Sequence, residues 1–294
     1  MHTDTVSAAE ITVEDIFTFL ASRWRWLLAG LFFGAIVALL YAFLQAPIYR
    51  SEILVTPANN DAAQSGLSSL AGQFGGLGQL ASIVGVGGGE ASELVALLKS
   101  RKIAQSFIES EQLLQYLYPN NWDTTTMSMV PAAGRLPPTM SQAVARFNSS
   151  IKEISENKLT GLVLVSIEWS DRTLAAKWAN DFVAHVNEIA RSKAIEESGN
   201  TISYLTQQLS TNDILEVKQA IYKVIEASVT RRAMAATRRD FGFRVVDPAV
   251  VPDLGTQVRP RTLLLVSIGA AAGVALSLAL LSFLLFYQWT RNKR

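Results

Sequence analysis

Few side chains in this sequence are arranged for chemistry on a bound substrate. The best candidate for a carboxylate pair is Glu168 with Asp171, but Asp171 lies where a helix N-cap is expected. A glycosidase needs two carboxylates at a set separation in a cleft, which this spacing does not provide. The chain has no Cys, and its two His are His2 and His185. These counts argue against thiolate metal sites, cysteine nucleophiles and a His-dependent triad.

Nucleotide-binding signatures are also missing. No G-x-x-x-x-G-K-[ST] occurs in the chain, so no P-loop is expected. Nine of the 18 Gly lie between Gly66 and Gly89, but no strand leads directly into a G-x-G-x-x-G there. We therefore expect a non-enzymatic protein with no catalytic residues, no cofactor and no metal ion.

Basic and aromatic side chains offer possible contacts instead. Two pairs of arginines repeat at an interval of seven residues and are expected on one helix face: Arg231, Arg232, Arg238 and Arg239. They could contact a sugar, another subunit or a partner, or form a solvated face with ion pairs between subunits. Three tryptophans could stack on sugars or serve a core or an interface: Trp122, Trp169 and Trp178. His185 lies near Phe182 and Val186 and is expected to pack or to face solvent.

Two charge-free runs place these groups relative to a membrane. No charged residue occurs from Trp26 to Tyr49 or from Thr262 to Thr290, although the whole chain is 17% charged. Each run exceeds the roughly 20 residues that span a bilayer as a helix. The sequence therefore predicts transmembrane helices at 26–44 and 262–287, which excludes a soluble cytosolic enzyme.

The orientation follows from the flanking residues. The 25 residues before the first span hold four acids, and Gln45-Ala46-Pro47 is a poor cleavage site, so an anchor is favoured over a signal peptide. Five basic residues flank the spans on the side of the termini, against four on the other side. The positive-inside rule thus favours cytoplasmic tails, 1–25 and 288–294, with residues 45–261 on the far side of the membrane.

Small residues four apart mark both predicted spans. Gly30 and Gly34 lie in the first span, and Gly269 and Gly273 lie in the second. Such spacing lets helix backbones approach closely in lipid, where packing drives association. We therefore expect helix contacts at these glycines, although glycine is also common in spans generally.

The segment between the spans is neutral and mixed in pattern. It contains 21 acids and 21 bases, so it has no bulk attraction for nucleic acid. Hydrophobic periodicity predicts strands at 49–56, 162–169 and 241–246. It predicts helices at 93–118, at 139–154 and, with a break at 210–213, at about 172–239. Residues 58–89 could be a mobile loop or could order against a neighbouring subunit.

The long helical region is the most distinctive element. Its first piece, about 38 residues, would reach roughly 55 Å, more than a compact domain of this size. It should therefore project and pack on helical neighbours. Asp213 and Glu216 have the spacing of a capping box for the second piece.

The order of these elements resembles the Wzz chain-length determinants, or polysaccharide co-polymerases. A Tyr-x-Ser-x-Ile-x-Val strand follows the first span, and Phe-Arg-Val-Val-Asp-Pro-Ala-Val-Val-Pro precedes the second. Pro248, Pro252, Pro260 and Arg261 match the family's proline-rich approach to the second span, but its middle proline is replaced by Leu254-Gly-Thr-Gln. The absence of a Walker motif places the resemblance in the kinase-free class.

The resemblance implies an α+β membrane protein. A periplasmic α/β base domain with a long protruding helical arm would stand between two transmembrane helices in the bacterial inner membrane. Subunits would form a ring-like homo-oligomer. With a separate polysaccharide polymerase, this scaffold would set the chain length of a lipid-linked glycan such as the O-antigen of lipopolysaccharide.

Two other functions remain open from the sequence. A two-span sensor with a periplasmic ligand domain would need a cytoplasmic output module, which the short tails do not supply. A two-span accessory protein of polysaccharide export would need an arm long enough to reach other envelope components. The first helical piece is short for a connection to the outer membrane.

Overall fold

The computed structural model describes residues 23–58, 89–131, 136–211 and 214–292, and these form two units. One unit contains the two apolar helices, with residues up to Ile48 and from Gln257 onward. The other is the α+β unit, Tyr49–Thr256. The predicted capping box includes Asp213, which lies outside the described residues, as do residues 59–88 of the glycine-rich stretch.

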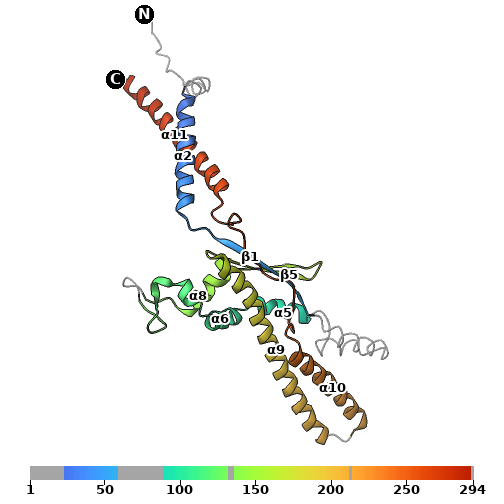
Figure 1. Cartoon of the computed structure of the whole chain (residues 1–294). Helices are drawn as coiled ribbons and strands as arrows, with labels where there is room; N and C mark the ends of the chain where they lie inside the picture. Colours follow the sequence, from blue (N-terminus) through green and yellow to red (C-terminus); the bar gives the residue numbers. More distant parts are fainter. Residues whose placement is uncertain (1–22, 59–88, 132–135, 212–213, 293–294) are drawn as a thin grey trace, which may run out of the picture. The chain divides into compact units, whose positions relative to one another are not determined.

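The first unit consists of two helices, α2 (Trp24–Leu44) and α11 (Thr262–Asn292). Both are long and apolar enough to cross a membrane, with mean hydropathies of 2.5 for Trp24–Leu44 and 2.3 for Thr262–Leu284. They pack against each other where they cross (Figure 1). Most of their large apolar side chains remain exposed, as expected for helices whose outer surface faces lipid.

A four-stranded antiparallel sheet organises the α+β unit. Its order is β4 (Lys152–Asn157), β5 (Leu162–Trp169), β1 (Tyr49–Pro57) and β6 (Phe243–Asp247). Central strands β1 and β5 pair from Tyr49 opposite Trp169 to Val55 opposite Val163. Alternate side chains enter one apolar core, including Ile53, Val55, Val163, Val165 and Ile167. The two-residue period that predicts the strands therefore also determines which of their side chains face the core.

Helices cover that apolar face, and we call the sheet together with these helices the base domain. They are α5 (Gly89–Lys99), α6 (Arg101–Ser110), the short α7 (Leu114–Leu117), α8 (Met140–Arg146) and the first half of α9 (Arg172–Thr211). A 3-10 turn (Pro119–Asn121) and a small hairpin of β2 (Trp122–Asp123) and β3 (Ser128–Met129) lie between α7 and α8. Phe107, Phe147 and Phe182 form the aromatic centre, with ring centroids 5.2–5.9 Å apart.

The predicted arm is a helical hairpin. Helix α9 runs for 40 residues, and α10 (Leu215–Thr237) returns beside it (Figure 1). The buried residues of α9 end at Ser198, and α9 packs against α10 in the described part of the chain. The mixed helix and sheet class and the long helical arm predicted from the sequence are confirmed.

Two predicted helices differ from the structure. The helix expected at 93–118 is divided at Ser100 and again around Gln112, whose φ is 51°. The helix expected at 139–154 begins as predicted, with Thr139 in a capping box with Gln142. It continues as a π-turn (Phe147–Ile151) and gives way to strand β4, so Ile154 is a strand residue. Pairing with β5 outweighs the local helical pattern there.

Candidate functional site: the glycine contact, the return segment and the arm

The structure brings the four predicted glycines together where α2 and α11 cross. A Cβ added at Gly30 would lie 2.7 Å from the carbonyl oxygen of Gly273. A Cβ at Gly34 would meet the carbonyl oxygen of Gly269, and one at Gly269 would meet the side chain of Ala38. Because backbone atoms occupy the space, any larger residue must push the helices apart.

A short backbone pairing lies at the base of the helix pair. The amide of Ile48 donates to the carbonyl of Arg259 at 3.0 Å, and the amide of Val258 donates to the carbonyl of Ile48 at 2.9 Å. The half-buried Pro260 and the exposed Arg261 follow directly, before α11 begins. The chain leaving the first apolar helix is thus tied to the chain approaching the second.

Two asparagines of α9 hold the residues that lead back toward the second apolar helix. We call residues 243–256 the return segment. Asn187, which is buried, donates to the carbonyl of Phe243 at 2.8 Å and accepts from its amide at 2.6 Å. Asn180 makes the same pair of bonds with Ala249, at 2.9 and 3.0 Å. The two asparagines are seven residues apart and therefore share one helix face.

Further side chains bind carbonyl groups of the return segment. Ser51 of β1 donates to Val250 at 2.7 Å, and Arg172 of α9 donates to Pro252 at 3.1 Å. Pro248 is exposed, and Pro252 is half-buried. Side chains of β1 and α9 therefore hold the part of the return segment that follows β6.

Glu168 and Asp171 do not form a carboxylate pair of the glycosidase kind. Glu168 is buried and accepts from the guanidinium of Arg50 at 2.9 and 2.5 Å. The hydrogen bond to Glu168 raises the pKa of Arg50. Asp171 caps α9 by accepting from the amides of Thr173 and Leu174 at 2.8 and 3.3 Å. The side-chain hydrogen bond from Thr173 is the main cause that lowers the pKa of Asp171.

One lysine lies inside the core. The ammonium of Lys152 donates to the carbonyl of Leu98 at 2.8 Å and lies 4.7 Å from the ring centroid of Phe182. Removal from water lowers its pKa to about 8. Its bond satisfies a carbonyl in the last turn of α5, where the helix has no amide of its own to offer.

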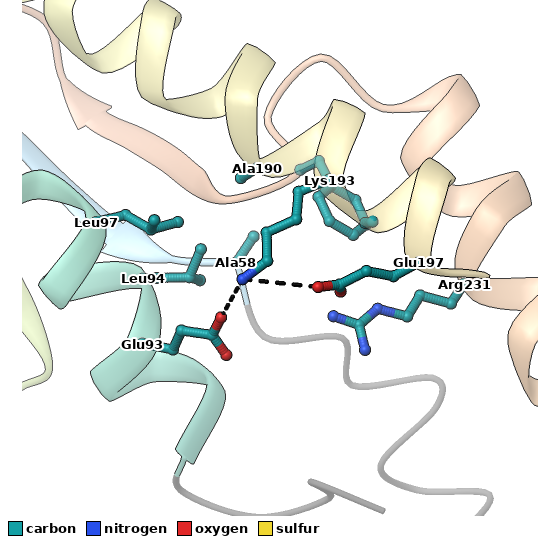
Figure 2. A pocket seen from close by; sticks show the side chains of 10 residues that line it. Ala58, Glu93, Leu94, Leu97, Ala190, Lys193, Glu197 and Arg231 are labelled. Atoms are coloured by element: carbon teal, nitrogen blue, oxygen red, sulfur yellow. Dashed lines mark hydrogen bonds and ion pairs between the residues drawn. The ribbon is translucent and has the colours of Figure 1, made fainter. Parts of the chain in front are cut away.

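A small cavity of about 50 Å³ lies where the arm meets α5. Lys193 stands between Glu93 of α5 and Glu197 of α9, at 2.6 and 3.7 Å (Figure 2). The hydrogen bond between Glu93 and Lys193 lowers the pKa of Glu93 and raises that of Lys193. Arg231 of α10 also lines the cavity. The ion pair therefore links the arm to the base domain.

The four predicted arginines do not share one helix face, which corrects that expectation. Helix α10 ends at Thr237, and Arg238 adopts an extended conformation with φ −100° and ψ 127°. Arg231 lines the cavity in Figure 2, whereas Arg238 and Arg239 line a second hollow beyond the helix. The repeat of seven continues in the sequence, but the helix stops before the second pair.

Trp169, Trp178 and His185 make packing contacts. Trp178 is buried, with its ring 5.1 Å from that of Trp169. His185 bonds the hydroxyl of Ser106 at 2.9 Å and packs against Phe107. Burial lowers the pKa of His185. The half-buried Trp122 pairs with Met129 in the small hairpin.

The sequence did not single out Asn187 or Lys152, whereas Ser51 is the serine of the Tyr-x-Ser-x-Ile-x-Val strand. A polar residue among the apolar positions of a long helix was the available signal for Asn187, because buried polar groups are kept for their hydrogen bonds. Lys152 lies at a core position of β4. The sequence predicted a helix over that region, so this core position was not recognised.

Two apolar helices flanking an α+β unit with a helical arm define a class of membrane-anchored proteins. Residues 9–111 match the family model described as Wzz, chain length determinant protein. This match confirms the resemblance to the Wzz family that the sequence indicates.

Solved structures give weaker likenesses. A "full-length bacterial polysaccharide co-polymerase" is 11% identical, with 96% of this chain and 99% of that chain covered and a TM-score of 0.41. A fragment of WzzB, a polysaccharide co-polymerase from Salmonella Typhimurium, is 14% identical over 70% of this chain and 97% of that chain, with a TM-score of 0.33. At TM-scores below 0.5, neither likeness supports an inference. No sequence match was found among curated proteins.

Proposed function

We propose that this protein regulates the chain length of a polysaccharide and does so as a scaffold, without catalysing a reaction. The observation that carries the proposal is the family-model match over residues 9–111, together with apolar helices on both sides of the α+β unit. Asp171 acts as a helix cap, and Arg50 and Lys193 form ion pairs. The comparisons favour neither a sensor nor an export accessory protein.

The described contacts suit a scaffold. The asparagine clamps fix the return segment to α9, and α9 continues into the arm. A displacement of the arm would therefore be transmitted to the segment that leads toward the second apolar helix. Such a connection can hold a polymerase and its product in a set geometry, which requires binding surfaces but no nucleophile or general base.

The proposal includes a location and partners. Residues 26–44 and 262–287 would span the bacterial inner membrane, with tails 1–25 and 288–294 in the cytoplasm and 45–261 in the periplasm. The protein would form a ring-like homo-oligomer and act with a separate polysaccharide polymerase on a lipid-linked glycan, which could be O-antigen. Imaging of detergent-extracted particles tests the ring, and a monomer would contradict it.

Deletion of the gene tests the function. We expect polymer to persist in the deletion strain while its length distribution broadens or shifts on a polyacrylamide gel. Re-expression of the intact chain should restore the distribution. An unchanged distribution would overturn the proposal, and complete loss of polymer would indicate a role in synthesis itself.

Single-cysteine labelling tests the orientation, because the native chain has no Cys. A cysteine at the exposed Leu159 should react with an impermeant maleimide in cells whose outer membrane is permeabilised. A cysteine at Thr5 of the N-terminal tail should react only after the inner membrane is opened. The reverse pattern would place the α+β unit in the cytoplasm.

A further inference from the structure

A second hollow, of about 460 Å³, lies beyond the end of α10. Its walls are the end of β1, the turn from α10 to β6 and the first part of β6: Thr56, Pro57, Ala58, Arg238, Arg239, Asp240 and Arg244. This volume lies within the roughly 300–1,000 Å³ that small-molecule sites occupy. All four of its charged residues are exposed and can reach a ligand from solvent.

The backbone around the hollow is held in place by the base domain. The amide of Ala58 donates to the carbonyl of Gly242 at 2.8 Å, and Asn187 binds the next residue, Phe243, at two points. A Cβ at Gly242 would lie 3.0 Å from Oδ1 of Asn187 and 3.2 Å from Cβ of Ala190. The turn therefore lies tightly against α9, and Arg244 is fixed in register opposite Thr56.

The charge of the hollow differs from that of the segment around it. Three guanidinium groups and one carboxylate give a formal charge of +2, whereas residues 45–261 are neutral overall. Within the described part of the chain, none of Arg238, Arg239 and Arg244 takes part in an ion pair. A helix C-terminus attracts cations, but that accounts for Arg238 alone.

Arginine is suited to planar anions. Its guanidinium presents N–H donors in a fork that matches carboxylate and phosphate oxygens two at a time. Three such forks around one open hollow, with a single acidic side chain, favour an anionic ligand over a neutral one. A neutral sugar would instead be held by aromatic faces and several uncharged polar groups, whereas the lining residues include no aromatic side chain and a single uncharged polar one, that of Thr56.

We propose that the hollow formed by Arg238, Arg239 and Arg244 binds an anionic group, carboxylate or phosphate, of the glycan on which the protein acts. The choice of a glycan rests on the proposed function, whereas the anionic character rests on the side chains alone. An acidic sugar of the polymer and the phosphate of a lipid carrier offer the same chemistry to the arginines. Binding would hold one point of the glycan against the base of the arm.

Calorimetry on the full chain in phosphatidylcholine nanodiscs tests the site. The probes are tetragalacturonate, inorganic pyrophosphate and the neutral control maltotetraose. We expect saturable binding of at least one anion, no binding of maltotetraose, and weaker binding at higher salt. Tighter binding of tetragalacturonate assigns the site to an acidic sugar, and tighter binding of pyrophosphate assigns it to the carrier phosphate.

Matched variants locate the binding. Arg239→Gln and the double variant Arg239→Gln/Arg244→Gln should weaken binding by about threefold and at least tenfold, with an unchanged melting temperature. Arg232→Gln removes the same charge outside the hollow and should change affinity by less than twofold. Absence of binding by both anions, or an equal loss in Arg232→Gln, would overturn the inference. Since binding is measured in vitro, unchanged glycan lengths in the deletion strain would contradict only the proposed function.

Discussion

In the pair formed by α2 and α11, four glycines let two backbones touch. In the α+β unit, two asparagines bind backbone groups of Phe243, in the outermost strand β6, and of Ala249, which follows that strand. Both contacts fix the chain near its approach to the second apolar helix. The first works by removing side chains and the second by adding polar ones.

The difference follows from the surroundings of each region. Lipid tails are as apolar as the helices, so the helices gain from close packing and small residues. In the α+β unit, an amide or carbonyl that leaves water must find a partner, so a buried asparagine that offers both donor and acceptor is favoured. The same result, a fixed backbone, thus requires opposite residue types.

The largest expected effect is at the glycine contact. Gly34→Leu places a large side chain where the carbonyl of Gly269 lies and should separate the helices. Spin labels on cysteines at Val37 and Leu264 should then report longer and broader distances. Ala271→Leu adds the same side chain on an exposed face of α11 and should leave the distances unchanged. Equal distances in all three proteins would show that the glycines do not set the crossing.

The asparagine clamps should differ from each other in strength. Asn187→Ala leaves the buried amide and carbonyl of Phe243 without partners and should cost about 2–4 kcal/mol in the free energy of unfolding. Asn180→Ala removes the same two bonds at a half-buried site, where water can replace them, and should cost about 1 kcal/mol. Denaturant titration of the full chain in detergent measures both. Similar costs for the two variants would mean that burial does not set the difference.

The buried lysine predicts how stability changes with pH. The pKa of Lys152 is about 8 in the folded chain, below its ordinary value of 10.5, so the unfolded chain binds more protons between these values. Stability should therefore rise with pH through this window, by about 1 kcal/mol between pH 7 and 9. Lys152→Met should remove this rise relative to the wild type. A parallel pH dependence in both proteins would contradict the assignment.

The smallest expected effect is at the ion pair that links α5 to the arm. Lys193 and Glu93 are both about half exposed, so water competes with their attraction. A double-mutant cycle with Lys193→Met and Glu93→Gln should give a coupling energy of about 0.5 kcal/mol. A value as large as that of the asparagine clamps would mean that the arm is held chiefly by charge.

The sequence predicted local features well. The strand at 162–169 matches β5, and the cap at Asp171 is present. These features depend on a period of two and on residues within one turn, which the chain order contains. Two predictions from local pattern were wrong. The helix predicted at 93–118 is divided, and residues 152–154 of another predicted helix belong to a strand. Both differences depend on distant partners, which the local pattern does not show.

By itself, the sequence determined two apolar helices, a neutral segment between them, a long helical arm and the absence of a recognisable catalytic set. Each of these follows from composition or from periodicity along the chain. Only the tertiary structure decided that Asn187 meets Phe243, 56 residues away, and that Arg239 and Arg244 share a hollow. Such pairings depend on how separate elements pack, because the local sequence around a side chain does not identify the distant group that it will contact.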